Sequence, residues 1–415
     1  MGNAVIMTVG TGIGSNIKSL AKSLAESILN KSPDKVYFIY THDSLETVDQ
    51  IMRRLPMQVE IEKVKLSDCD DFDSVFREMR AVFSKARSSY DNVTVNYTSG
   101  AKTMSAAAVF AGILEEVDWL EVIAGTRKGG IVQCGTEKLI NYKTKKLLAE
   151  IELRKKLVPL FNMHLYDQAR WLLEGIKEEI TFENIGALIE LVNAYDCWDK
   201  FMHGDALEHL KGGIDCSKQS ERNHDVAVLN ASFSKNRGFL ERLKKSDDHK
   251  KYEFLIADLI NNAERRGEEG KFDDAVARLY RTFEMLAEYG LRRRGIRLDK
   301  IDANDLPEQI RDKWKDKIED GKLEIGLKQK YDLLKDLKDP LGEKYEDAEL
   351  KELLRKRNYS ILAHGLDHVG QAPYEKLLEK VKGIAKEEIP GLSQLQEDAK
   401  FPLLNDDDLL RMIGD

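Results

Sequence analysis

The first 125 residues alternate between short apolar segments and longer segments with helical periodicity. The strand-like segments are residues 4–9, 35–40, 58–64, 92–96 and 119–124, and the helix-like segments between them are 15–29, 44–54, 72–87 and 103–115. Such alternation is typical of a parallel sheet with helices on both faces, because a parallel crossover needs a connection about as long as a helix. We therefore predict an α/β Rossmann-like domain over residues 1–145.

Two turns of this predicted domain are rich in small residues and follow strands. One begins at Gly10 after the first strand, and the other spans residues 98–102 between the fourth strand and its helix. Ligands of open α/β sheets bind beyond the carboxyl ends of the strands. Small residues let main-chain N–H groups approach a phosphate, a helix N-terminus adds its dipole, and Lys102 adds a full charge.

Two familiar nucleotide-binding patterns fit these turns poorly. The first turn is spaced G-x-G-x-G, which displaces the third glycine of the dinucleotide fingerprint, and residues 40–43 supply no clear ribose-binding acid. The second turn is not a P-loop, because the glycine required five residues before Gly100 is Val95. Nicotinamide binding is therefore weakly supported, and nucleotide hydrolysis by the P-loop route is disfavoured.

Length and composition limit the rest of the chain. With 415 residues it is too long for one core, and residues 146–250, rich in Leu and Ala without strand alternation, predict a helical connecting domain.

The apolar runs are too short for a membrane span, and Lys18 and Lys22 exclude a signal-type core, so we expect a cytoplasmic protein without membrane contact. Four cysteines without a C-x-x-C pair indicate neither a metal site nor a disulfide framework. A net charge of −8 implies that any contact with nucleic acid is local.

The C-terminal third holds a segment suited to phosphate chemistry, Arg-Asn-Tyr-Ser-Ile-Leu-Ala-His-Gly at residues 357–365. If it continues as one helix, seven steps return to within about 20° of the starting direction, so Arg357 and His364 share a face roughly 10 Å apart. Arginine offers a fork of donors to a phosphate, and neutral histidine can take a proton from a ribose 2′-hydroxyl. This pair needs no metal.

The segment resembles the R-x(4–6)-H signature of HEPN ribonucleases, with six residues between Arg357 and His364. Residues 271–288 resemble the early helix of that domain in CRISPR-associated ribonucleases, with apolar residues at helical spacing. The resemblance implies an all-α HEPN domain over residues 251–390, followed by a C-terminal extension over 391–415. It also implies that His364 acts as general base or acid, that Arg357 stabilises the developing charge, and that Asn358 orients the helix and the phosphate.

Residues 96–104, Asn-Tyr-Thr-Ser-Gly-Ala-Lys-Thr-Met, are similar to the N-x-T-G-G-T-K-x-M signature of CARF domains, which bind cyclic oligoadenylates. Ser99 replaces the first glycine of the pair, and Ala101 replaces the threonine and so removes a hydroxyl. The resemblance implies that a cyclic oligoadenylate is bound by Gly10, Thr11, Gly12, Ile13, Thr98, Ser99, Gly100, Ala101, Lys102 and Met104.

Together the two motifs resemble the ancillary ribonucleases of type III CRISPR systems. The resemblance implies an endoribonuclease of antiviral defence that cuts single-stranded RNA through its 2′-hydroxyl. Such an enzyme uses neither a metal nor another cofactor and is activated allosterically by cyclic oligoadenylate. An alternative is a nucleotide-sensing regulator or binding protein with a silent C-terminal domain. That alternative predicts a DNA-reading element, and no helix-turn-helix signature with a basic recognition helix is evident.

The predicted spacing of the catalytic pair also bears on assembly. Roughly 10 Å along one helix is too far for both side chains to reach one phosphate easily, whereas a two-fold axis would place two Arg357 and two His364 around one cleft. The same symmetry would suit a cyclic ligand. We therefore expect a homodimer.

Four other segments and one further histidine carry expectations. The basic cluster at 291–297 either lines an RNA path or caps its helix. Residues 305–349 are expected to form exposed helices and loops, residues 244–251 a linker or solvated turn, and residues 387–415 a peripheral tail. His368 would lie near His364 if the helix continued past Gly365.

Overall fold

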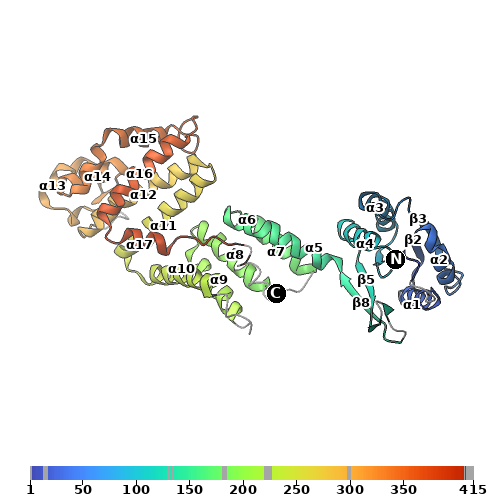
Figure 1. The fold of residues 1–415 in the computed structure, drawn as a ribbon. Coiled ribbons are helices and arrows are strands. Elements are labelled where there is room, and N and C mark those ends of the chain that lie inside the picture. The colour runs from blue at the N-terminus through green and yellow to red at the C-terminus, as the bar shows by residue number, and fades with distance from the viewer. Residues whose placement is uncertain are drawn as a thin grey trace. The chain divides into compact units, whose positions relative to one another are not determined.

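The computed structural model describes residues 2–12, 17–128, 131–132, 135–179, 185–218, 227–296, 301–405 and 407. It contains two compact units (Figure 1). Unit 1 comprises Met1–Leu153 with Ile176–Ile180, and unit 2 comprises Arg154–Gly175 with Thr181–Asp415. Each unit has its own core and is described separately. No helix in the described part of the chain is both long and apolar enough to cross a lipid bilayer.

Unit 1 is built on a six-stranded sheet of order β3-β2-β1-β4-β5-β8. The first five strands in space are parallel, and β8 is antiparallel to β5. The strands are β1 (Asn3–Val9), β2 (Lys35–Tyr40), β3 (Glu60–Lys65), β4 (Asn92–Asn96), β5 (Trp119–Ala124) and β8 (Lys138–Lys143). The predicted parallel sheet is thus confirmed, with an antiparallel edge strand that the sequence did not indicate.

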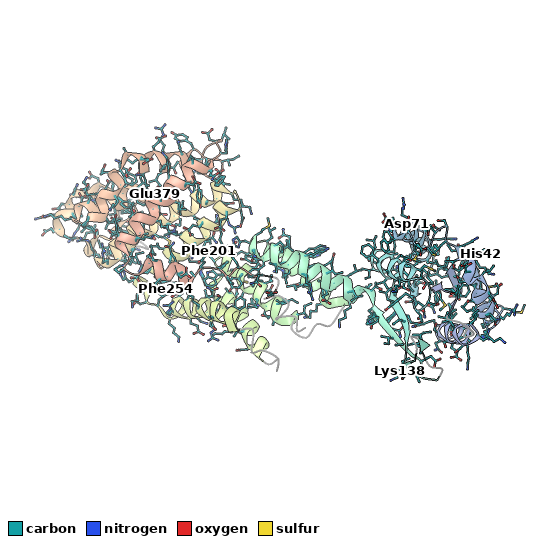
Figure 2. The ribbon with its side chains drawn as sticks, viewed as in Figure 1. His42, Asp71, Lys138, Phe201, Phe254 and Glu379 are labelled. Carbon is teal, nitrogen blue, oxygen red and sulfur yellow. The ribbon has the colours of Figure 1, made fainter. Side chains whose placement is uncertain are left out.

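Helices cover both faces of this sheet, as predicted. On one face α1 (Ile17–Leu29) and α2 (Leu45–Met52) share a core with Val5 and Met7 of β1. On the other, α3 (Phe72–Ser89) and α4 (Lys102–Leu114) pack against Ile6. Both faces of β1 are therefore buried, which explains its unbroken apolar sequence. Asp71, labelled in Figure 2, caps α3 by accepting a 3.2 Å hydrogen bond from the N–H of Ser74.

The strand order changes direction at β1, which lies between β2 and β4. Strands β1 and β4 are parallel neighbours, so the turns that follow them start at the same edge of the sheet. A short hairpin of β6 (Arg127–Lys128) and β7 (Ile131–Val132) follows β5. The crevice beside such a switch point is where open α/β sheets bind ligands.

The rest of the chain is mostly helical. After α5 (Thr144–Glu152) and the π-helical turn Leu153–Leu157 come α6 (Val158–Asn162), α7 (Tyr166–Glu179), α8 (Ile185–Asp199), α9 (His203–Lys218) and α10 (Ala227–Lys245). The C-terminal helices are α11 (Asp248–Glu268), α12 (Phe272–Arg293), α13 (Glu308–Lys313), α14 (Leu327–Asp336), α15 (Ala348–Asn358), α16 (Gln371–Glu388) and α17 (Leu392–Asp398). The helical character predicted for residues 146–250 is confirmed in the described residues.

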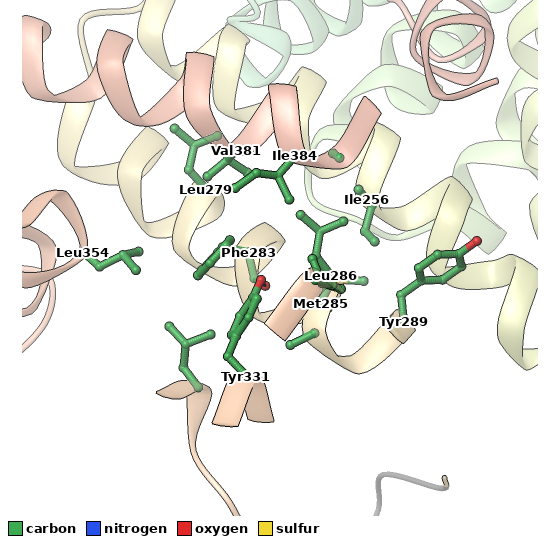
Figure 3. Close-up of a cluster of buried hydrophobic side chains, with 14 of the residues drawn as sticks. Ile256, Leu279, Phe283, Met285, Leu286, Tyr289, Tyr331, Leu354, Val381 and Ile384 are labelled. Atoms are coloured by element: carbon green, nitrogen blue, oxygen red, sulfur yellow. Dashed lines mark hydrogen bonds between the residues drawn. The ribbon is translucent and has the colours of Figure 1, made fainter. Parts of the chain in front are cut away.

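Helix α12 runs through the main core of unit 2 (Figure 3). Its apolar positions Ala275, Leu279, Phe283 and Leu286 are fully buried, as their spacing predicts. Phe283 stacks on Tyr331 of α14 at a ring separation of 4.4 Å, and the Tyr331 hydroxyl donates to the Phe283 carbonyl. The expectation of exposed helices over 305–349 is therefore wrong for α14, which is part of the core, and right for α13, which has no buried residue.

The stretch 244–251 holds a short solvated turn between two helices, one of the two expected alternatives, and not an extended linker. Helix α10 ends at Lys245 and α11 begins at Asp248, so only two residues separate them. The Asp247 side chain accepts hydrogen bonds from the N–H groups of His249 and Lys250, which starts α11 at once.

The segment 391–404 is not peripheral. Phe401 packs among aromatic rings that include Tyr195 and Trp198 of α8. Asn162 and the main chain of Leu404 exchange two hydrogen bonds of 2.8 Å. The Asn236 amide donates to the carbonyls of Asp398 and Lys400. The C-terminal segment thus joins α6, α8 and α10 to the helices that follow them.

Candidate functional site

The two predicted ligand turns meet at one pocket of about 510 Å³ in unit 1. Eight of the ten predicted ligand residues line it: Gly10, Thr11, Gly12, Thr98, Ser99, Gly100, Ala101 and Met104. Ile13 lies outside the described residues. Lys102 is the first residue of α4, with an exposed side chain that is not part of the lining.

Close contact between the two turns requires glycine. A Cβ on Gly10 would lie 2.7 Å from the main-chain nitrogen of Gly100, and Gly100 itself has a φ of +116°. The Ser99 hydroxyl accepts a 3.0 Å hydrogen bond from the Gly10 N–H, and the Ser99 carbonyl accepts one from the Thr8 hydroxyl. Ser99, a departure from the CARF signature, therefore ties the turns together.

Asn96 supports the conformation of the second turn through hydrogen bonds. It is fully buried, its amide donates to the Ser27 hydroxyl and to the Glu121 carboxylate, and its oxygen accepts from the Thr98 N–H. Thr98 in turn accepts a 2.8 Å hydrogen bond from the Ile123 N–H on β5. Asn96, the first residue of the 96–104 motif, thus holds the turn in its conformation.

The sequence motifs missed several lining residues that neighbouring elements bring to the pocket. Two are acids, Asp43 and Glu137, and among the described lining residues there is no lysine or arginine. Hydrogen bonds from its own N–H, from the Gly135 N–H and from Ser23 hold the pKa of Glu137 below its usual range. The other missed residues are Ser19, Leu20, Ser23, Thr41, Cys69, Ile123 and Val132. None belongs to a recognisable motif, because the fold alone gathers them.

In unit 2 the predicted continuous helix through His364 is wrong. Helix α15 ends at Asn358, and the next residues form a closed loop. The His364 N–H donates to the Asn358 carbonyl at 3.2 Å, and the Gly365 N–H donates to the Ser360 carbonyl. A Cβ on Gly365 would lie 1.8 Å from the Tyr359 carbonyl oxygen, so only glycine closes this loop. The estimate of 10 Å along one helix therefore does not apply.

Loop closure brings the main chain of His364 back to the end of α15. The guanidinium of Arg357 lies 4.2 Å from the centre of the Tyr280 ring, and its Nη1 donates to the Asn358 side-chain oxygen at 3.2 Å. No carboxylate of the described residues lies within ion-pair distance of Arg357. The His364 side chain is exposed. A cation without an acidic partner and an accessible imidazole thus flank one loop.

The loop is anchored to α12 at its far end. Both carboxylate oxygens of Asp273 accept from the Val369 N–H at 3.1 Å. His368 is exposed in the turn before α16 and does not share a helix with His364.

The basic cluster at the end of α12 pairs with acids. Arg293 and Arg294 both contact Asp339, and Arg292 contacts Asp248. Burial alone would raise the pKa of Asp339, but the hydrogen bond from Arg294, that from the Leu341 N–H and the two positive charges lower it overall. The cluster closes the helix end, which favours its capping role over an RNA path. Arg297 lies outside the described residues.

His203 and His209 make separate 2.8 Å contacts with Asp258 and Glu190, not with each other. Among the described residues, one group with metal-ligand spacing was found, formed by Asp68, Cys69 and Asp70 of unit 1.

Comparison with known families assigns both helical parts. Residues 244–388 match a family model described as the Csm6 HEPN domain, and residues 148–243 match one described as the Csm6 6H domain. The two matches together span more than half of the chain. The chain belongs to the Csm6 family. Its HEPN domain makes this Csm6 protein an endoribonuclease. A third model, described as "HFX_2341_N:-like, N-terminal", matches residues 21–124.

Structure comparison agrees with this Csm6 assignment at the level of the fold. Enterococcus italicus Csm6 bound to cyclic hexa-2′-fluoro-hexa-dAMP matches with a TM-score of 0.62 at 14% sequence identity, over 96% of this chain and 99% of that one. A search of curated protein sequences gave no significant match. The predicted order of a Rossmann-like CARF domain, a helical region and a HEPN domain is confirmed.

Proposed function

We propose that this endoribonuclease acts in CRISPR defence, that cyclic oligoadenylate activates it, and that Arg357, Asn358 and His364 form its catalytic site. The observation that supports the assignment is the closed loop, which returns the main chain of His364, with its exposed side chain, to the end of α15, where Arg357 has no carboxylate partner among the described residues. We assign the sensing domain to residues 1–145, the connecting domain to 146–250, the nuclease to 251–390 and the C-terminal extension to 391–415.

The reaction needs only groups of the protein and of the RNA. A neutral His364 takes the proton of a ribose 2′-hydroxyl, and the 2′-oxygen attacks the adjacent phosphorus. The P–O5′ bond breaks, which leaves a 2′,3′-cyclic phosphate, and the 5′-oxygen takes a proton from a protonated imidazole. Arg357 stabilises the charge on the phosphorane, and Asn358 fixes the guanidinium through its side-chain oxygen.

A homodimer would supply two such histidines. Around the loop, Tyr359, Ile361, Leu362 and Leu366 are exposed, and Leu366 reaches 92% exposure. Neighbouring apolar side chains of this kind favour contact with another protein surface. We propose that a second copy covers them across a two-fold axis, so that one imidazole accepts the proton while its partner donates one.

The pocket of unit 1 would hold the activator. Small residues at both turns let backbone N–H groups reach a phosphate, and the N-terminus of α4 contributes its dipole. We propose the eight lining residues and Ile13 as contacts, with Lys102 reaching the ligand from outside the lining. The Csm6 structure that matches this chain holds a cyclic hexanucleotide analogue. Single-stranded RNA is the proposed substrate, and the cytoplasm is the proposed compartment.

Cleavage of a labelled single-stranded RNA should be measured with linear tetra-adenylate and with cyclic tetra- and hexa-adenylate. We expect one cyclic ligand to raise the cleavage rate, and the linear control to have little effect. A chain that binds a cyclic ligand but cuts no RNA would instead be a sensor with a silent C-terminal domain.

A further inference from the structure

Arg357, on α15, has a different environment from the arginines of α12. Arg278 contacts Asp274, Arg281 contacts Glu288, and Arg293 contacts Asp339. Arg357 has no such partner in the described part of the chain. The Cζ atom of its guanidinium lies over the ring of Tyr280, 4.2 Å from the ring centre.

This difference matters for a group that must bind phosphate. A carboxylate would occupy the N–H edges of the guanidinium and offset its charge. An aromatic ring attracts the cation through its face and leaves most of the N–H edges free. Tyr280 can therefore hold Arg357 without competing with RNA.

The ring is itself held firmly. Tyr280 lies on α12 between Leu279 and Phe283, both fully buried, and its own side chain packs against the same core. Its hydroxyl has no hydrogen-bond partner among the residues that the structure describes. The contact thus depends on the aromatic face, and α12 acts as the support for a guanidinium that belongs to α15.

We propose that Tyr280 is a positioning residue that orients Arg357 for the transition state of RNA cleavage. The inference rests on the proposed catalytic role of Arg357. A cation–π contact of this kind contributes enough to change a rate by about 2- to 30-fold.

Three variants of the full-length chain test the proposal under saturating activator. Tyr280→Leu should lower the maximal cleavage rate by about 2- to 30-fold and leave the KM for RNA within about twofold. Tyr280→Phe should restore the parental rate. Tyr252→Leu is the matched control, because Tyr252 also lies under an arginine, Arg292, at 5.1 Å on another part of the domain. It should cut RNA at the parental rate.

A graded series excludes a folding artefact. Phenylalanine with one, two or three ring fluorines at position 280 keeps the shape and weakens the negative ring face step by step. The maximal rate should fall with each fluorine while the melting temperature stays constant. A flat series, or a loss in Tyr252→Leu equal to that in Tyr280→Leu, would overturn the role of Tyr280.

Arg357→Ala must be measured beside these variants. If Arg357→Ala cuts RNA normally, the catalytic assignment itself fails. If Arg357→Ala is inactive and every Tyr280 variant is normal, only the present inference fails.

Discussion

The N–H of His364 donates a hydrogen bond to the carbonyl of Asn358, six residues earlier, across 3.2 Å. This bond closes the loop after α15 and returns the histidine to the neighbourhood of Arg357. The number of residues between Arg357 and His364 is thus set by loop closure and not by helical periodicity.

Arg357→Ala and His364→Ala should each reduce RNA cleavage strongly. Removal of a positioned acid or base costs about 10²–10⁴-fold in rate. Binding of the activator and the melting temperature should match those of the parent, since both side chains face solvent or a ring. Stopped assays with saturating activator measure the rate, and parental cleavage by either variant would refute its catalytic role.

Gly365→Ala should abolish cleavage although it changes no catalytic side chain. Its Cβ would lie 1.8 Å from the Tyr359 carbonyl oxygen, so the loop must open and His364 must move. Gly370→Ala is the matched control, because a Cβ there meets nothing within 4 Å. Equal cleavage rates for the two variants would show that loop closure does not matter for catalysis.

Lys102→Ala should raise the activator concentration needed for half-maximal cleavage and leave any basal cleavage unchanged. A ligand shifts an equilibrium only by its differential affinity for the two states, so lost contacts reduce the shift. Lys85→Ala removes the same charge from α3, where Lys85 pairs with Glu62 away from the pocket lining, and should respond as the parent does. Titration with the active cyclic oligoadenylate checks this, and an identical response of both variants would exclude a contact from Lys102.

Cleavage should persist in excess EDTA, and the 5′ product should end in a 2′,3′-cyclic phosphate. The reaction proposed for Arg357 and His364 needs no metal. Mass spectrometry of the products distinguishes the cyclic phosphate from the free 3′-hydroxyl that a metal-dependent nuclease would leave. A strict requirement for magnesium would contradict the mechanism.

Asp339→Asn should destabilise unit 2 at neutral pH by about 1–3 kcal/mol, because Arg293 and Arg294 lose a buried partner. The pKa of Asp339 is lowered in the folded state, so its stabilisation is full above the unfolded pKa and is lost as pH falls through the folded value. Urea unfolding at a series of pH values should therefore show the variant and the parent converging in acid. Asp316→Asn, at an exposed site, is the control, and a loss at Asp339 that does not change with pH would argue against the ion pairs.

The features that could be predicted from the sequence are those that depend on short stretches of consecutive residues. Strands β1 and β2 of unit 1 are buried on both faces and therefore have apolar sequences, and α12 keeps its apolar residues on one face. The turns at Gly10 and Gly100 could be predicted because the ends of strands and the small residues after them can be recognised in the amino-acid sequence itself.

Other features depend on contacts distant in sequence. The sequence after Asn358 is compatible with a helix. Helix α15 nevertheless ends at Asn358, because the chain folds back and Gly365 packs closely against the main chain of Tyr359. Asp43 and Glu137 reach the pocket from elements without a motif. The bonds between Asn162 and Leu404 join residues 242 positions apart, which no local pattern reports.

The C-terminal segment that joins α6, α8 and α10 to the nuclease helices also orders events during synthesis. A ribosome makes protein from the N-terminus, so Asn162 and Asn236 meet their partners only after a further 242 and 162 residues have been translated. A chain stalled before residue 391 lacks this junction. Helices α6, α8 and α10 therefore acquire their full set of contacts only after the nuclease helices between them and Phe401 have been made.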